Sequence, residues 1–410
     1  MPGRIHVVIL LLAAAMGLAF ASVSTYDFAQ HLDRQMHELH CSFIPGQHGD
    51  AAAGETQGCQ VTLMSPYSSV LRSMVWGGIP ITLPAMAVFA FLLFRGVDLF
   101  GRRGRERRAA AGFLFAAAAI PVVASGVMGT IALVQLEAAC KVCIGIYGAS
   151  LVSLLAAGLC FASLRRAVDE EPDDASDGGA GKVWLMGLLQ LAAFVAVPVL
   201  AYVALMPDYS RYVGTCGKLA DSADPGGVMV PLDANAGAPV AIEVFDPLCP
   251  ACRAFDRSVV DAKLDRKMHR MAVLFPLEQE CNWMVEGAVH PGACTVSEAI
   301  LCAQTSNAVA PAQVIEWAFA QQDQIRAAGK TDPAAPKRMV LERFGELSSC
   351  LGSAEVQQRL NKSLRWAVDH HIPVSTPQLY VGGTKLCPED TDLGLEYSLS
   401  RMLARQGGQP

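Results

Sequence analysis

Five stretches of the chain are nearly free of charged residues, and each is long enough to cross a membrane. They cover residues 5–23, 74–94, 109–136, 143–164 and 183–206. An α-helix needs about 20 apolar residues to span the hydrocarbon core of a bilayer. The pattern therefore predicts five transmembrane helices within the first half of the chain.

Beyond the fifth stretch, short apolar runs alternate with amphipathic segments. Residues 239–245 and 271–277 are apolar runs of strand length, and a Cys-Pro-Ala-Cys sequence at 249–252 begins a helix between them. A further strand with a tight turn is expected over 374–383, and a closing helix over 393–405. This order of elements predicts a soluble α/β domain in the second half.

Composition agrees with a membrane protein. Of 410 residues, 52% are apolar and only 17% are charged, which is too apolar for an ordinary soluble protein. The formal charge of −6 comes without a basic stripe interleaved with aromatic residues, so nothing favours nucleic-acid binding.

Arginines in the loops set the expected orientation. Six arginines lie between residues 95 and 108, whereas residues 24–73 hold two, so the arginine-rich loop should be cytoplasmic. The acidic loop at 165–182 does not change this assignment, because acidic residues weigh little in the rule. Six cysteines then share one oxidising, extracytoplasmic compartment. They are Cys41, Cys59, Cys140, Cys143, Cys249 and Cys252.

The first apolar stretch has a second interpretation. Arg4, the apolar run and Ala19-Phe20-Ala21 resemble a cleavable signal peptide over residues 1–21. The run is long for a signal sequence, so we interpret it as an uncleaved span. Either interpretation leaves residue 24 outside.

Two Cys-x-x-Cys pairs are the candidate chemistry. Cys140 and Cys143 open an apolar helix, with Lys141 nearby to favour a thiolate, so this pair could reduce a lipid-soluble quinone. A structural disulfide or a metal pair is the alternative. Metal binding would recruit the outer-loop histidines, which we expect to be solvated instead. These are His31, His37, His40 and His48.

Residues 5–165 resemble the vitamin K epoxide reductase family. The match rests on the loop pair Cys41 and Cys59, the Ser65-Pro66-Tyr67 segment, and Cys-x-x-Cys followed by Tyr147. The resemblance implies a four-helix bundle that holds a quinone, either ubiquinone or menaquinone. Cys143 would deliver electrons to it, with Tyr147 and Ser65 helping to position the quinone or the loop helix.

In the same resemblance, Cys140 exchanges disulfides with Cys59, and Cys41 is the shuttle thiol that meets the redox partner. One departure is the spacing of Cys41 and Cys59. The 17 residues between them include a Gly/Ala-rich insert at 46–58. The family usually has a shorter gap, but lengthening a flexible loop costs only about 0.6 kcal/mol per doubling.

Residues 215–405 resemble the DsbA-like branch of the thioredoxin superfamily. The resemblance makes Cys249 the attacking cysteine, Cys252 the resolving one and Pro377 a cis-proline beside them. Glu243 would be the buried acid that serves proton transfer to Cys252; the alternative is a residue at the end of a strand.

Six further cysteines should form structural disulfides in an oxidising compartment. Cys281 and Cys294 flank an irregular stretch and are the expected pair. The sequence does not pair the others, which are Cys216, Cys302, Cys350 and Cys387.

We therefore expect three parts: a membrane bundle over 1–168, an acidic linker and fifth span over 169–214, and an α/β domain over 215–410. The expected function is a quinone-dependent oxidase that forms disulfides in exported proteins with free thiols, in a bacterial inner membrane. The alternatives are a reductase that runs the same chain backwards and a non-enzymatic metal- or peptide-binding protein.

Overall fold

The computed structural model describes residues 4–35, 37–47, 55–168, 178–233, 235–306 and 309–407. The chain divides into two compact units, Met1–Pro207 and Asp208–Pro410. The acidic residues expected at 169–177 and the middle of the insert, 48–54, lie outside the described residues.

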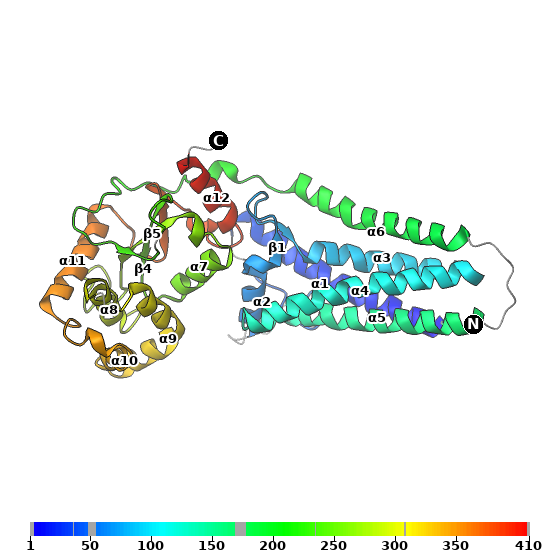
Figure 1. The fold of residues 1–410 in the computed structure, drawn as a ribbon, viewed down its shortest axis with the longest axis horizontal. Coiled ribbons are helices and arrows are strands. Elements are labelled where there is room, and N and C mark those ends of the chain that lie inside the picture. Colours follow the sequence, from blue (N-terminus) through cyan, green and yellow to red (C-terminus); the bar gives the residue numbers. More distant parts are fainter. Residues whose placement is uncertain are drawn as a thin grey trace. The chain divides into compact units, whose positions relative to one another are not determined.

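Five long helices make up most of the first unit (Figure 1). They are α1 (Arg4–Gln30), α3 (Thr82–Gly101), α4 (Gly104–Val134), α5 (Lys141–Val168) and α6 (Gly178–Leu205). Among the described residues, these five are long and apolar enough to cross a membrane. The prediction of five spanning helices is confirmed.

The bundle is formed by α1, α3, α4 and α5. Helix α1 packs against α3 and α5, and α4 packs against the same two helices. The fifth helix, α6, lies against α3 and α4. Its Tyr202 hydroxyl donates a hydrogen bond to the Gly78 carbonyl, which ties α6 to the hairpin that precedes α3.

The second span begins at Thr82 rather than at residue 74, so that expected boundary was wrong. Two short antiparallel strands, β1 (Ser69–Val70) and β2 (Ile79–Pro80), occupy the preceding residues. Gly78 has φ +77°, and a Cβ there would meet the Val70 carbonyl oxygen. The apolar composition of this segment hides a turn that only glycine fits.

A five-stranded sheet organises the second unit. Its order is β3-β5-β4-β6-β7, with β4 parallel to β5 and the other pairs antiparallel. The strands are β3 (Val230–Pro231), β4 (Val240–Phe245), β5 (His269–Leu274), β6 (Gln378–Val381) and β7 (Thr384–Lys385). After its first residue β4 is wholly buried, as expected for an apolar central strand.

Helix α7 (Pro250–Asp261) connects β4 to β5, and four helices are inserted between β5 and β6. The four are α8 (Ala293–Ser306), α9 (Pro311–Thr331), α10 (Ala335–Arg343) and α11 (Ala354–Asp369). Helix α12 (Leu395–Gln406) closes the unit. This connectivity is a thioredoxin-like fold with a helical insertion, so the predicted fold class is confirmed.

The remaining described helical segments are short. They are α2 (Glu55–Met64) and the 3₁₀ turns His31–Asp33, Pro66–Ser68, Ser210–Tyr212, Asp265–Lys267, Gly345–Leu347 and Pro388–Asp390.

Three disulfides cross-link the second unit. Cys281 is bonded to Cys294, as the sequence predicted. The two pairs that the sequence did not assign are Cys216–Cys387 and Cys302–Cys350.

Candidate active site

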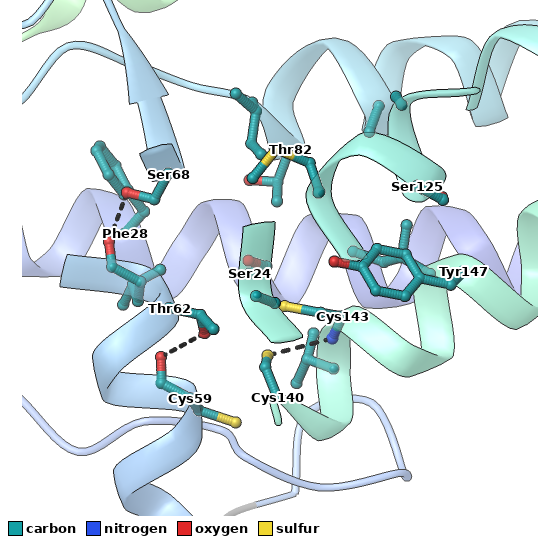
Figure 2. Close-up of a pocket in the computed structure, with 18 of the residues that line it drawn as sticks. Ser24, Phe28, Cys59, Thr62, Ser68, Thr82, Ser125, Cys140, Cys143 and Tyr147 are labelled. Carbon is teal, nitrogen blue, oxygen red and sulfur yellow. Dashed lines mark hydrogen bonds between the residues drawn. The ribbon is translucent and has the colours of Figure 1, made fainter. Parts of the chain in front are cut away.

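A cavity of about 430 Å³ lies in the first unit and is lined mostly by apolar side chains. Its wall draws on α1, α2, α3, α4 and α5, and three cysteine side chains face it (Figure 2). These are Cys59, Cys140 and Cys143. The structure thus brings the loop pair and the helix pair to one apolar cavity.

Cys140 and Cys143 sit at the N-terminus of α5 as free thiols. The Cys143 backbone N–H donates a hydrogen bond of 3.2 Å to the Cys140 Sγ. Hydrogen bonding from Cys143 lowers the pKa of Cys140 to about 7. Tyr147 lies one turn further along α5 and lines the cavity with Cys143.

Cys59, on α2, is bonded to Cys41, and both are buried. The chain between them therefore closes in spite of its length. Helix α2 approaches the segment before α5 so closely that a Cβ at Gly58 would overlap the Ala139 carbonyl oxygen. Glycine next to Cys59 lets that cysteine come near Cys140.

Ser65 lines the cavity, but its hydroxyl donates to the Thr62 carbonyl at 2.9 Å. The buried Arg72 guanidinium donates to the Ser65 carbonyl and to the Ser68 hydroxyl. These bonds fix the turn that follows α2. Ser65 is therefore placed on the cavity wall as part of a rigid turn.

One polar pair on this wall is not marked by any motif in the sequence. Asp27 of α1 and His40 both line the cavity, with His40 Nδ1 2.6 Å from Asp27 Oδ1. The available signal was an acid in the last turns of an apolar helix. The expectation of solvated histidines was wrong for His31. It is buried, and its two ring nitrogens lie 2.7 and 3.1 Å from the Asp27 and His37 carbonyl oxygens.

The second unit carries the other cysteine pair. Cys249 caps α7 and Cys252 lies within its first turn; both are buried free thiols. The Thr376–Pro377 peptide bond is cis, as the resemblance implies for Pro377. The Cys249 thiol donates to the Thr376 carbonyl at 3.7 Å.

The two thiols of this pair differ in acidity. Hydrogen bonding from Cys252, with further help from Thr376, lowers the pKa of Cys249 to about 6. Burial raises the pKa of Cys252 well above its ordinary value. Cys249 is therefore the more readily ionised thiol of the pair, and Cys252 is the one that keeps its proton.

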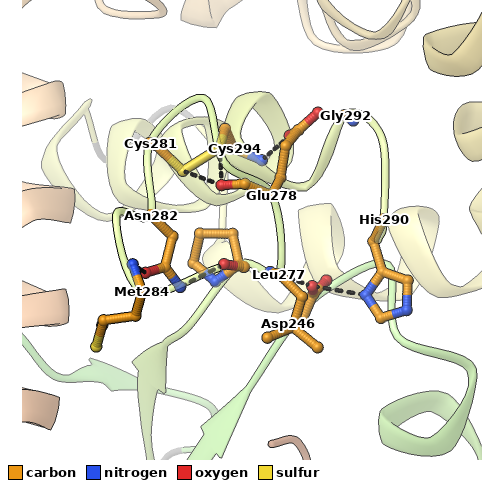
Figure 3. Close-up of a disulfide and its surroundings, with 10 residues drawn as sticks. Asp246, Leu277, Glu278, Cys281, Asn282, Met284, His290, Gly292 and Cys294 are labelled. Carbon is orange, nitrogen blue, oxygen red and sulfur yellow. Dashed lines mark hydrogen bonds and ion pairs between the residues drawn. A yellow bond between two sulfur atoms is a disulfide. The ribbon is translucent and has the colours of Figure 1, made fainter. Parts of the chain in front are cut away.

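A loop between β5 and α8 brings a histidine to this site (Figure 3). His290 Nδ1 lies 2.8 Å from the buried Asp246 carboxylate, in the turn that leads to Cys249. Burial opposes the charge on His290, but the hydrogen bond to Asp246 outweighs it and raises the pKa of His290. Its charge also helps to lower the pKa of Cys249.

The same loop is held by covalent and polar contacts. The Cys281–Cys294 disulfide closes it, and the Glu278 carboxylate accepts 2.8 Å hydrogen bonds from the Gly292 and Cys294 N–H groups (Figure 3). These contacts fix the loop that bears His290. No local pattern marks that histidine, because its partner lies 44 residues earlier.

Glu243 lies within β4 and pairs in register with Ala272 and Leu379 on the two neighbouring strands. The alternative of a strand-end residue was therefore wrong. Its carboxylate is 2.7 Å from Arg270 Nη2, which also binds Asp256 at 2.6 Å. Burial raises the pKa of Glu243, although the charge of Arg270 opposes the rise.

Comparison with known proteins agrees with the geometry of the first unit. Residues 8–157 match the model of the vitamin K epoxide reductase family. A search of curated proteins finds no significant match. Among solved structures, reduced DsbA1 from Neisseria meningitidis is similar at 16% identity and a TM-score of 0.31, over 46% of this chain and 90% of that one.

The thioredoxin-like fold of the second unit does not depend on that match. It is recognised by its strand order, by the cysteine pair at the start of α7 and by the adjacent cis-proline. The chain therefore joins a unit with five candidate membrane spans, which matches the vitamin K epoxide reductase family over residues 8–157, to a unit with a thioredoxin-like fold.

Proposed function

We propose that this protein is a quinone-dependent thiol oxidase that forms disulfides in exported proteins. Substrate thiols reduce the Cys249–Cys252 disulfide, electrons pass through Cys41 and Cys59, and the pair at α5 delivers them to a membrane quinone. The observation that carries the proposal is the shared cavity. Cys59, Cys140 and Cys143 all line this cavity, and its apolar wall suits a lipid-soluble acceptor.

The lining of the cavity fits a quinone of the ubiquinone or menaquinone type. Such sites are mostly apolar with a few polar groups that fix orientation. Cys143, Tyr147 and Ser65 are the groups assigned to hold the ring. When bound, the quinone supplies a two-electron acceptor that also takes up two protons.

The acidity of the Cys249 thiol supports electron flow from client thiols to the second unit. A thiol with a pKa of about 6 is roughly 90% ionised at pH 7, whereas an ordinary cysteine is only about 3% ionised. A stable thiolate favours the reduced pair, which makes the Cys249–Cys252 disulfide more oxidising than one between ordinary cysteines. The second unit is therefore suited to accept electrons from client thiols.

Topology and tethering support the remaining steps. The arginine-rich loop supports a topology in which all six redox cysteines lie on the outer side of a bacterial inner membrane. A covalent tether gives the thioredoxin-like unit an effective concentration of up to about millimolar at the loop pair. Weak recognition between the two units is then sufficient.

The test uses the purified full chain in detergent, with a reduced unfolded protein as substrate and a short-chain quinone as acceptor. We expect one quinone reduced for each substrate disulfide formed, and no turnover in Cys143→Ala. Cys160→Ala is the matched control, because Cys160 is a buried free cysteine of α5 that does not line the cavity. Unchanged turnover in Cys143→Ala would reject the route.

Direction is tested separately by acid trapping of Cys249 and Cys252 in growing cells. A pair that is mostly oxidised supports the oxidase. A pair that is mostly reduced would instead indicate that the thioredoxin-like unit feeds electrons to the membrane site.

A further inference from the structure

An acid and a histidine share the quinone cavity with the cysteines, and the relay gives them no task. Asp27 accepts two hydrogen bonds from His40, from Nδ1 at 2.6 Å and from the backbone N–H at 3.0 Å. Both residues line the cavity that Cys143 and Tyr147 line. The pair therefore lies where an acceptor would be reduced.

The location of Asp27 needs a reason. The residue belongs to α1, within a candidate membrane span, and its side chain is only 6% exposed. Ionisable groups inside a span are costly and usually mark a proton or substrate path. The His40 side chain keeps 18% exposure, so it is less enclosed than the carboxylate that it binds.

We propose that Asp27 and His40 form the proton donor of the quinone site, with His40 supplying the proton and Asp27 orienting its ring. This inference rests on the proposed quinone reduction. Imidazole suits the role because it takes up and releases protons near neutral pH. A carboxylate that binds one ring nitrogen fixes the tautomer and orientation of the other.

The stoichiometry needs such a donor. When the pair holds one thiolate, which hydrogen bonding favours at Cys140, it carries a single proton. When the Cys140–Cys143 bond forms, two electrons leave the sulfurs and only one proton leaves with them. The second proton comes from the His40 imidazolium, so two electrons and two protons reach the acceptor and no net charge remains. His40 is then reprotonated from the aqueous side.

A structural role is the competing explanation, because Asp27 also holds the backbone next to Cys41 through the His40 N–H. Loss of that contact would disturb the loop disulfide rather than proton transfer. The two roles therefore affect different steps. Disulfide exchange at Cys41–Cys59 reports the structural role, and quinone reduction by the prereduced protein reports the chemical one.

The test uses His40→Asn and Asp27→Asn in the full chain. The asparagine amide at position 40 keeps the donor to Asp27 but does not titrate, and the amide at position 27 keeps the acceptor for the backbone N–H. His37→Asn is the matched control, since His37 forms a similar pair with Asp33 at 2.8 Å and does not line the cavity.

Two rates are measured by rapid mixing: reduction of a short-chain quinone by prereduced protein, and exchange of Cys41–Cys59 with a small dithiol in the absence of quinone. We expect both variants to slow quinone reduction about 100-fold or more, which is typical for loss of a general acid. Exchange should stay within about twofold of wild type. Added imidazole should restore quinone reduction in His40→Ala.

Wild-type quinone reduction in His40→Asn would overturn the inference, and so would an equal slowing of both rates or a failure of imidazole to rescue. Loss of quinone reduction in the wild-type protein is a different result. It would remove the proposed function itself.

Discussion

The acidity of Cys249 is the property that a single substitution should change most clearly. His290→Asn removes a charge near the thiolate, while its amide can still donate to Asp246 in place of Nδ1. A nearby opposite charge lowers a pKa by about 1 to 3. Taking the lower end, we expect the pKa of Cys249 to rise from about 6 to about 7.

The free-energy consequence follows from linkage. The folded-state pKa of Cys249 lies below its unfolded value. Ionisation of Cys249 therefore stabilises the reduced folded protein, and this stabilisation is complete above the unfolded pKa. It is lost as the pH falls through about 6. At pH 7 the variant thiol would be about 50% rather than about 90% ionised. The thiolate contribution to the reduced state would drop by about 1 kcal/mol, or roughly fivefold in the redox equilibrium.

The assay is the pH dependence of Cys249 alkylation in the reduced full chain, followed by peptide mass spectrometry. Wild-type alkylation should be nearly constant above pH 7 and should fall about tenfold per pH unit below 6. His269→Asn is the control. Its ring pairs with Asp233 at 3.0 Å in the same way. His269 is the first residue of β5 and lies beside Val240, at the opposite end of β4 from Cys249. An unchanged midpoint in His290→Asn, or an equal shift in the control, would refute the reasoning.

Two further substitutions test the packing of each unit. Gly58→Ala should push α2 away from the segment before α5 and slow disulfide exchange between Cys59 and Cys140 at least tenfold in a trapping assay. The control is Gly148→Ala, whose added Cβ meets no neighbour within 4 Å and should leave the rate unchanged. Arg270→Met should leave Glu243 as a buried unpaired acid and destabilise the fold by about 3–5 kcal/mol in denaturant unfolding. Exposed Arg266→Met is its control; equal losses in the two arginine variants would contradict the role of the ion pair.

Local patterns in the sequence predicted much of the fold. Five apolar runs became five helices because helix length and hydrocarbon thickness constrain each run separately. The hairpin before α3 escaped prediction because its residues are as apolar as the span, and only the backbone of Gly78 marks the turn. Cys281 and Cys294 could be paired across 13 residues, whereas Cys216 and Cys387 are 171 residues apart.

The candidate site was predictable to the extent that motifs mark it. The cysteine pairs and Tyr147 are spaced along the sequence in recognisable ways. Asp27 with His40, and Asp246 with His290, are brought together by folding across 13 and 44 residues. Side-chain pairs of this kind depend on tertiary packing, which no local periodicity encodes.

Disulfide mapping by mass spectrometry in the Cys143→Ala and Cys252→Ala proteins tests the electron path most directly. Cys252→Ala removes the thiol that would displace Cys41 from Cys249, and Cys143→Ala removes the thiol that would displace Cys59 from Cys140, so each mixed disulfide should accumulate. The account predicts a Cys59–Cys140 bond in the first variant and a Cys41–Cys249 bond in the second. A direct bond between Cys249 and Cys140, with Cys41–Cys59 left intact, would contradict it.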